Sequence, residues 1–192
     1  IKLNLQNAQG DTSNISTISD QLVSDNVDLV LAIATPAAQA IAGKTSDIPI
    51  LATAVTSYEG AGLVKDETAP GGNLSGTSDM NPVAAQIDLL SEMYPDAKTI
   101  GLIYNSSEAN SGIQIDLAKE QIEKTGLKYE EATITNTNDV QQAMQSLVTK
   151  CDAVYIPTDN TVASSMPTVR SVTTESKTPT MCGTSTMVDD GG

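Results

Sequence analysis

Polar side chains follow apolar runs at several places in this sequence, and they are the residues best suited to bind a small molecule. Thr35 comes directly after the apolar run at 28–34, and Thr56 follows the run at 48–55. In open parallel sheets, ligands bind outside the carboxyl ends of the strands, where helix N-termini offer free N–H groups to anions. If both runs are strands of such a sheet, these two hydroxyl groups lie at its binding edge.

The second half of the chain carries two larger polar clusters in the same position. NSSEANS (105–111) ends one apolar run, and TDNT (158–161) follows the run at 153–157. Asp159 and Asn160 offer a carboxylate and an amide where one capping residue would suffice, which favours contact with a ligand. A helix cap alone is the other interpretation of TDNT and of Thr35, and both interpretations stay open.

Two further features are candidate parts of a site. Tyr58 and Tyr104 are the aromatic residues best placed to stack on a ligand, and packing in the core explains them equally well. The glycine-rich segment at 69–76 lacks the Lys-Ser/Thr pair that a P-loop places after its glycines. It therefore indicates a turn that leads into a strand.

The composition excludes several classes of function. The chain of 192 residues has 24 acidic and 10 basic residues and a net charge of −14, which argues against binding to nucleic acid. It has no histidine, so the usual general base and the commonest transition-metal ligand are both missing. Cys151 and Cys182 match no zinc spacing, although one disulfide between them is compatible with the sequence. We expect neither a metal nor a cofactor.

The sequence has no membrane-spanning or targeting segment. No apolar run approaches the roughly 18 residues that a transmembrane helix needs. The chain opens on the strand-like IKLNLQNA without an initiator methionine or a signal-peptide pattern. We therefore expect that a leader was removed or that the chain is a fragment.

Strand-like and helix-like segments alternate along the whole chain. The periodicity and the flanking turn residues predict strands at 1–8, 28–34, 48–55, 99–105, 127–134, 152–157 and 178–184. They predict helices at 14–26, 35–47, 82–94, 110–126, 138–150 and 161–176. This alternation is typical of an α/β fold with parallel sheets.

An internal repeat predicts two similar lobes. KLNLQNAQGDTSNI, QLVSDNVDLVLAIAT and SDIPILAT resemble, in the same order, KYEEATITNTNDV, SLVTKCDAVYIPTD and SKTPTMCGT. A general likeness between any two β-α-β segments is the alternative explanation. The repeat predicts lobes at 1–98 and 99–192. The second copy is preceded by a strand and a helix that have no counterpart before Ile1, so we expect the natural protein to extend past both ends.

Six segments together resemble the substrate-binding lipoproteins of ABC importers, specifically the family with tryptophan-binding and other aromatic amino-acid-binding members. The segments are NAQGD, DLVLAIATPAAQAIA, IPILATAVTSYEGAGLV, PGGNLSGTSDMNPVAAQIDLL, PDAKTIGLIYNSSEANSGIQ and DAVYIPTDNTVASSM. The resemblance covers essentially the whole chain. It implies the type I periplasmic binding-protein fold, in which two hinged, flavodoxin-like lobes close on one small ligand.

The resemblance also implies partners and a location. It implies a small ligand, most simply an amino acid, an ABC transporter permease as partner, and an extracytoplasmic position. Family members hold the membrane through a lipidated N-terminal cysteine, which this sequence does not contain. An ordinary amino acid suits the polar clusters, because hydroxyls and a helix N-terminus bind a carboxylate while a carboxylate pairs with an ammonium.

The resemblance assigns ligand contacts to both lobes. In the first lobe these positions are Ala34, Thr35, Ala54, Val55 and Thr56, with Tyr58 as a stacking candidate. In the second lobe they are Asn105, Ser106, Glu108, Asn110 and Ser111, with Asp159 and Asn160 at the ammonium. The sequence departs from the family at TSYEG, where an Asp-Pro pair commonly follows the threonine, so the side-chain pocket is not given by the resemblance.

Two other classes of protein are alternatives to a binding protein. A cofactor-independent amino-acid racemase has two like lobes and needs one cysteine at the strand carboxyl edge of each lobe, as acid and base. Cys182 could meet this requirement, but Cys151 precedes its strand and lies at the wrong end. The ligand-binding core of a transcription regulator would require a helix-turn-helix module, which the sequence lacks. We expect a binding protein with no catalytic residues.

Overall fold

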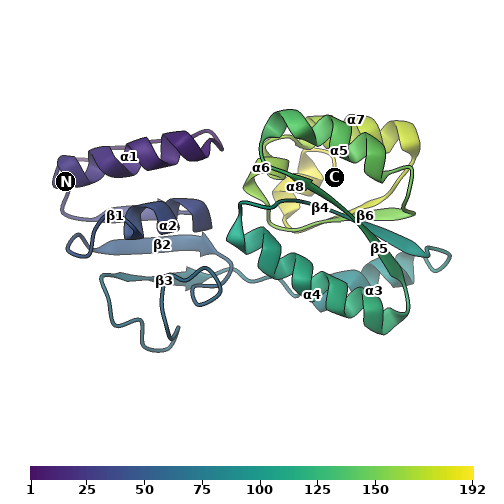
Figure 1. Ribbon diagram of the computed structural model, residues 1–192, viewed down its shortest axis with the longest axis horizontal. Helices are drawn as coiled ribbons and strands as arrows, with labels where there is room; N and C mark the ends of the chain where they lie inside the picture. Colours follow the sequence, from purple (N-terminus) through teal and green to yellow (C-terminus); the bar gives the residue numbers. More distant parts are fainter. The chain divides into compact units, whose positions relative to one another are not determined.

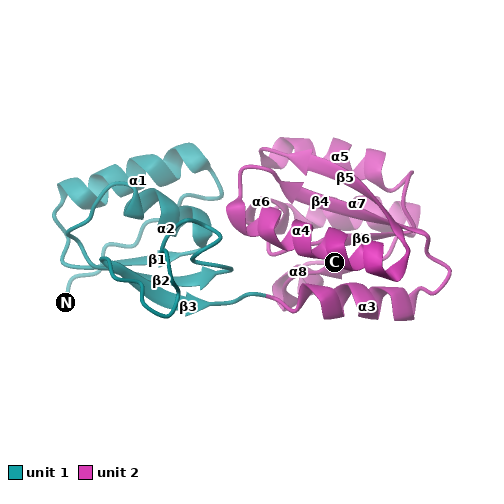
Figure 2. Ribbon diagram, turned by 60° about the horizontal axis from the view of Figure 1, so that its bottom comes forward, with its two compact units in different colours: residues 1–80 teal, residues 81–192 magenta.

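The chain folds as an α/β protein with parallel sheets, which confirms the predicted fold class. The computed structural model describes residues 1–192 (Figure 1). The chain divides into two compact units, residues 1–80 and 81–192, each with its own sheet (Figure 2). No helix is both long and apolar enough to span a membrane.

The first unit contains a three-stranded sheet and two helices. The strands are β1 (Val30–Ile33), β2 (Ile50–Val55) and β3 (Leu74–Ser78), and the helices are α1 (Thr12–Ser24) and α2 (Thr35–Ala42). The sheet order is β1-β2-β3 and both pairings are parallel, so the three carboxyl ends lie at the same edge.

One face of this sheet carries the core of the first unit. Alternate residues of β1 and β2 are buried, including Val30, Ala32 and Ala52, and they pack with Ala38 and Ile41 of α2. Helices α1 and α2 cover this face (Figure 1). The intervening side chains, among them Leu31 and Leu51, are exposed.

The second unit has a four-stranded parallel sheet in the order β5-β4-β6-β7. The strands are β4 (Thr99–Asn105), β5 (Lys128–Ile134), β6 (Ala153–Ile156) and β7 (Thr180–Cys182). The helices are α3 (Val83–Met93), α4 (Ala109–Thr125), α5 (Val140–Leu147), α6 (Asn160–Ala163), α7 (Met166–Ser176) and α8 (Ser185–Asp189), with a 3₁₀ turn at Thr137–Asp139.

This second sheet is covered on both faces, which explains the continuous apolar runs of β4 and β6. Helices α3 and α4 pack on one face, against Leu102 and Tyr155, and α5 and α7 pack on the other, against Ile103 and Val154 (Figure 1). All four residues of β6 are buried. Central strands of a parallel sheet have continuous apolar sequences because both of their faces are buried.

The compact units divide earlier than the predicted lobes at 1–98 and 99–192. The structure places the boundary between Met80 and Asn81, so α3 belongs to the second unit. The reason is packing: Val83, Ile87 and Leu90 of α3 are buried against α4 and the second sheet. A boundary drawn from the repeat alone cannot assign a helix that lies between the two copies.

The prediction of a strand at 1–8 is wrong for this structure. Residues 1–8 form neither a helix nor a strand, and Ile1, Leu3 and Leu5 are exposed. The apolar alternation is present, but a strand also needs a neighbouring strand for its hydrogen bonds. The sheet pairings of the first unit join only β1, β2 and β3.

The predicted helix at 161–176 is two helices, α6 and α7. The helix is interrupted at Ser164 and Ser165, and Pro167 lies in the first turn of α7. Proline has no N–H to donate and its ring clashes with the carbonyl group four residues earlier, so it is tolerated only in a first turn. The helix therefore has to restart just before Pro167.

The close packing around β4 leads to a prediction about Gly101. A Cβ atom at Gly101 would lie 2.7 Å from the Cys151 Sγ and 2.9 Å from the Leu147 Cγ. We expect Gly101→Ala to lower the free energy of unfolding by about 1–3 kcal/mol, measured by urea denaturation.

The matched control for Gly101→Ala is Gly112→Ala in α4. A Cβ atom at Gly112 meets nothing within 4 Å, and alanine favours a helix over glycine by up to about 1 kcal/mol. Equal effects of the two substitutions on the free energy of unfolding would contradict the packing explanation.

Candidate functional site

Ala34 ends β1 of the first unit in a strained backbone conformation. Its φ is 79° and its ψ is 152°, a region that residues other than glycine rarely adopt. Such a conformation costs on the order of 1–3 kcal/mol. The N–H of Ala34 donates to the Thr53 carbonyl at 3.0 Å, which ties the strained residue to β2.

A second strained alanine lies in the neighbouring strand. Ala54 has a φ of 54°, and the pairing of β2 with β3 is irregular between Ala52 and Val55. Thr56 is the first residue after β2 and is buried. Its carbonyl accepts a hydrogen bond from the Ser78 hydroxyl at 2.8 Å. Strained residues gather at functional sites, so two of them at one sheet edge support a binding role for this edge.

The N-terminus of α2 begins at this same edge. Ala34 takes the N-cap position and makes no side-chain capping bond. The first N–H groups of a helix have no acceptor within the helix, and they attract anions. The Thr35 side chain is buried beside them, and its Oγ1 has no hydrogen-bond partner. This edge of the first unit is therefore rich in donors.

The Glu67 carboxylate holds the loop that follows Thr56. Its Oε1 accepts hydrogen bonds from the Tyr58 N–H at 2.8 Å, the Glu59 N–H at 3.1 Å and the Ser57 hydroxyl at 3.1 Å. The Glu59 N–H, the Ser57 hydroxyl and the Tyr58 N–H together lower the pKa of Glu67. The Glu67 carboxylate thus holds the TSYEG segment in one conformation.

Tyr58 packs in the core of the first unit. Its ring belongs to the apolar cluster under the sheet, and its hydroxyl donates to the Ala52 carbonyl at 2.9 Å and the Thr77 carbonyl at 3.2 Å. Burial raises the pKa of this hydroxyl. This placement favours packing over stacking on a ligand.

In the second unit, Asp159 lies at the centre of a buried polar network. It is the N-cap of α6, and its Oδ1 accepts from the Val162 N–H at 2.8 Å. Its Oδ2 accepts from the Asn105 N–H at 2.6 Å and the Ser111 hydroxyl at 2.7 Å. One carboxylate thus joins the end of β4, the start of α4 and the start of α6.

Glu108 contributes a second buried carboxylate to this network. Its oxygens accept hydrogen bonds from the backbone and side chain of Asn160, the backbone and side chain of Thr161, and the side chain of Asn110. Neither carboxylate takes part in an ion pair. Backbone N–H groups, hydroxyls and amides therefore stabilise two negative charges without a cation.

This environment raises the pKa of Asp159 to about 6. Burial is the main cause, because it disfavours the charged form of a carboxyl group. Repulsion from Glu108 adds to the increase, while the hydrogen bonds from Asn105, Val162 and Ser111 oppose it.

Asn110 and Gln114 extend the network along α4. The Asn110 Nδ2 donates to the Thr158 carbonyl at 2.7 Å, and the Gln114 Nε2 donates to the Asn110 carbonyl at 3.0 Å and to the Thr158 hydroxyl. The Asn81 Nδ2 donates to the Gly183 carbonyl at 2.7 Å and so joins β7 to the start of α3.

The structure brings together most of the second-lobe residues predicted from the sequence. One hydrogen-bonded network contains Asn105, Glu108, Asn110, Ser111, Asp159 and Asn160. Ser106 is exposed, and its N–H donates to the Ile134 carbonyl at 3.1 Å.

The sequence analysis did not assign a role to Gln114 or Thr161, which are both buried in this network. The sequence does indicate that Gln114 is buried, because Gln114 lies one helical turn after Asn110, on the same buried face of α4 as Ile115 and Ala118. Thr161 was recognised only as part of a polar cluster.

Two buried side-chain oxygens in the chain have no hydrogen-bond partner, and both belong to predicted site residues. They are the Thr35 Oγ1 in the first unit and the Asn110 Oδ1 in the second. Each lies in the first turn of the helix that follows a strand, α2 after β1 and α4 after β4. Unsatisfied buried polar atoms are uncommon in folded proteins and call for an explanation.

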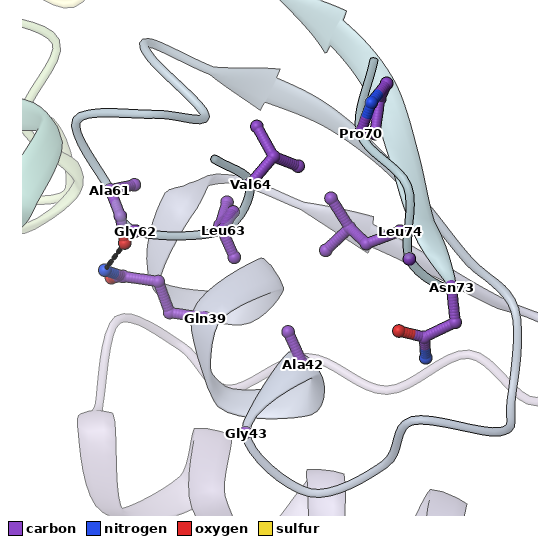
Figure 3. A pocket seen from close by; sticks show the side chains of 11 residues that line it. Gln39, Ala42, Gly43, Ala61, Gly62, Leu63, Val64, Pro70, Asn73 and Leu74 are labelled. Carbon is purple, nitrogen blue, oxygen red and sulfur yellow. Dashed lines mark hydrogen bonds between the residues drawn. The ribbon is translucent and has the colours of Figure 1, made fainter. Parts of the chain in front are cut away.

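A pocket within the first unit lies away from these residues. It has a volume of about 400 Å³ and lies in the first unit, between the second half of α2 and the segment that enters β3 (Figure 3). Gln39 reaches across it, and its Nε2 donates to the Ala61 carbonyl at 2.8 Å. No charged side chain and none of the predicted site residues lines this pocket.

The two cysteines are free and both belong to the second unit. Burial raises the pKa of the Cys151 thiol to about 11 and also raises that of Cys182. Thiols of this kind are poor acids and bases near neutral pH. No group of three or more Cys, Asp or Glu side chains is arranged to hold a metal ion.

Comparison with known proteins identifies the class of protein and then the family. The fold is that of type I periplasmic binding proteins: a leucine-binding protein from Thermotoga maritima matches with a TM-score of 0.68 at 13% identity, covering 100% of this chain and 55% of that protein. A sequence model of the ABC transporter substrate-binding proteins matches residues 1–192. The chain belongs to this family, which confirms the resemblance inferred from its sequence.

Two relatives are much more similar. A tyrosine-binding protein of Clostridioides difficile is 45% identical over 191 residues, which are 100% of this chain and 55% of that protein. A Streptococcus pneumonia ABC domain solved with L-Trp has a TM-score of 0.96 and 43% identity, covering 100% of this chain and 67% of that one. The chain thus spans about half the length of the curated relative that it matches.

The raised pKa of Asp159 predicts a dependence of stability on pH. An aspartate titrates near 3.8 in the unfolded chain and near 6 here, so the folded state binds the extra proton between these values. The free energy of unfolding should therefore fall as the pH rises from 4 to 7, by up to about 3 kcal/mol from this group. Asp159→Asn should remove that part of the slope, measured by urea denaturation at several pH values.

Asp116→Asn on the exposed face of α4 removes a carboxyl group outside the network and is the control. The explanation fails if Asp159→Asn and Asp116→Asn change the pH dependence of the free energy of unfolding by the same amount.

Proposed function

We propose that the protein is the extracytoplasmic solute-binding component of an ABC importer and that it captures an aromatic or aliphatic amino acid without changing it chemically. The family supports the transport role. The relatives that bind tyrosine and L-Trp, at 45% and 43% identity, support an amino acid as ligand. Both relatives are longer than this chain, so the ligand and the partners of this protein are part of the proposal.

The two unpartnered oxygens are the observation that carries the proposal. The Thr35 hydroxyl lies beside the free N–H groups of α2, and this combination of donors suits a carboxylate. The Asn110 Oδ1 is an amide oxygen and can only accept, and the bond from the amide nitrogen to the Thr158 carbonyl fixes its orientation. An acceptor next to two carboxylates suits an ammonium group. An amino acid carries both of these charged groups.

The proposed contacts follow from this division. The ligand carboxylate is bound from the first unit, by residues at the ends of β1 and β2: Ala34, Thr35, Ala54, Val55 and Thr56. The ammonium is bound from the second unit, by the exposed Ser106 and by side chains of the polar network: Asn105, Asn110, Ser111, Asp159 and Asn160. That a single ligand makes both sets of contacts, in a cleft between the lobes, stays a prediction.

Transport requires partners beyond the ligand. We infer that a permease of the ABC type receives the ligand from this protein. The lipid anchor inferred from the family resemblance also stays a prediction. We expect the ligand to bind the closed conformation of the protein more tightly than the open one, because it contacts both lobes only in the closed state. This difference in affinity would drive the closure of the lobes.

A thermal-shift screen against the twenty amino acids tests the proposal, with the natural polypeptide that contains residues 1–192. We expect one aromatic or aliphatic amino acid to raise the Tm. Calorimetry should then show that Thr35→Val weakens its affinity about 10–100-fold, because a hydrogen bond to a charged group is lost. The same substitution should leave the stability of the free protein nearly unchanged, since the Thr35 hydroxyl has no partner in it.

Analogues that lack one charged group identify the two ends of the site. For tyrosine these are tyramine, without the carboxylate, and 3-(4-hydroxyphenyl)propionate, without the ammonium. Thr35→Val should affect tyramine less than tyrosine, and Asp159→Asn should affect the propionate less than tyrosine. The amino-acid assignment is wrong if no amino acid raises the Tm.

A further inference from the structure

We infer that Glu108 is a positioning residue: it fixes the N-terminus of α6, and thereby Asp159, without touching the ligand itself. This inference rests on the proposed function, in which the second unit binds the ammonium group. It changes the role expected for Glu108 from the sequence, where it was one of several ligand contacts. The two buried carboxylates differ in how many hydrogen bonds they already accept.

The Glu108 carboxylate has no capacity left for a ligand. Its Oε1 accepts from the Thr161 N–H at 3.0 Å and the Thr161 hydroxyl at 2.9 Å. Its Oε2 accepts from the Asn160 N–H at 3.0 Å, the Asn160 Nδ2 at 2.6 Å and the Asn110 Nδ2 at 3.2 Å. A carboxylate offers roughly four lone-pair positions, so these donors saturate it.

Asp159 differs from Glu108 in this respect. Three donors reach its carboxylate, and the Oδ1 accepts only from the Val162 N–H. One acceptor position of the Oδ1 is therefore left for a donor from outside the network. Both side chains are almost fully buried, at 5% exposure for Glu108 and 1% for Asp159, so the difference between them lies in hydrogen bonding rather than in burial.

The position of Glu108 in its own helix indicates the same role. It occupies the N-cap of α4, where serine, threonine, aspartate and asparagine are preferred. Its side chain makes no capping bond to α4 and instead reaches the first N–H groups of α6, at Asn160 and Thr161. The Glu108 side chain does not cap its own helix, and it holds the start of another helix that lies more than fifty residues away in sequence.

Glu108 therefore joins the two loops that carry the proposed ammonium contacts. The loop after β4 contains Glu108 itself, and the loop after β6 contains Asp159 at the N-cap of α6. A bond from the Asn105 Nδ2 to the Thr161 hydroxyl at 2.8 Å links the same two loops. Because α6 has only four residues, its own hydrogen bonds can do little to fix its orientation. Without Glu108, the N–H groups of Asn160 and Thr161 lose their acceptors, and only the bonds of Asp159 and the Asn105–Thr161 bond hold the start of α6.

A double-mutant cycle distinguishes positioning from direct contact. Affinities for L-tyrosine, or for the amino acid that the screen identifies in its place, are measured for wild type, Glu108→Gln, Asp159→Asn and the double variant. We expect Glu108→Gln alone to weaken binding about tenfold or more. In the Asp159→Asn background, it should weaken binding by no more than about twofold, because residues that act through one another are not additive.

Hydrogen exchange supplies a readout that needs no ligand. In Glu108→Gln the backbone amides of Asn160 and Thr161 should exchange at least tenfold faster than in wild type. Glu120→Gln is the matched control, because Glu120 is an exposed glutamate of the same helix that pairs only with Lys124. It should change neither the exchange of these amides nor the affinity.

The outcomes separate this inference from the proposed function. Additive losses in the cycle, or unchanged exchange at Asn160 and Thr161, would overturn the positioning role while leaving amino-acid binding intact. A wild type that binds no amino acid would overturn the proposed function, and the exchange data would still decide what Glu108 does. If Glu108→Gln does not fold, Thr161→Val, which removes one donor to Glu108 and also the acceptor of the Asn105 Nδ2, should give the same non-additive loss.

Discussion

Two buried carboxylates without a cation determine the structure of the second unit's binding edge. Burying a negative charge is costly unless hydrogen bonds replace the water around it. Here the replacement comes from the first N–H groups of α6 and from neighbouring hydroxyl and amide groups. Since those donors come from loops far apart in sequence, satisfying the two charges forces the loops after β4 and β6 into one arrangement.

In the first unit, the carboxyl edge of the sheet is marked by strained backbone rather than by buried charge. Ala34 and Ala54 both have positive φ at the carboxyl ends of adjacent parallel strands. The consequence is a difference in character: the first unit presents donors, and the second presents acceptors. This difference supports the proposed division, in which the first unit binds a carboxylate and the second unit binds an ammonium group.

The positions of most helices and strands could be predicted from the sequence because local rules decide them. Apolar runs such as AVYI gave the buried strands, and Gly126, with its φ of 78°, ended α4 as expected. The errors arose where neighbours decide. Residues 1–8 have the strand pattern but no strand beside them, and α3 lies between the two copies of the repeat, where only packing shows its unit. Pro167, in contrast, is a local signal for the break before α7.

The sequence by itself determined the α/β class, the family and the clusters that hold the candidate site, because residue type and spacing along the chain carry that information. It could not separate the roles of Glu108 and Asp159, two acidic residues in similar polar clusters. Only the tertiary structure decided that Glu108 is saturated by donors and that Asp159 keeps an open position. It also decided that Tyr58 packs in the core. The reason is physical: the capacity of a side chain to bind a ligand depends on which of its atoms the rest of the chain has already used.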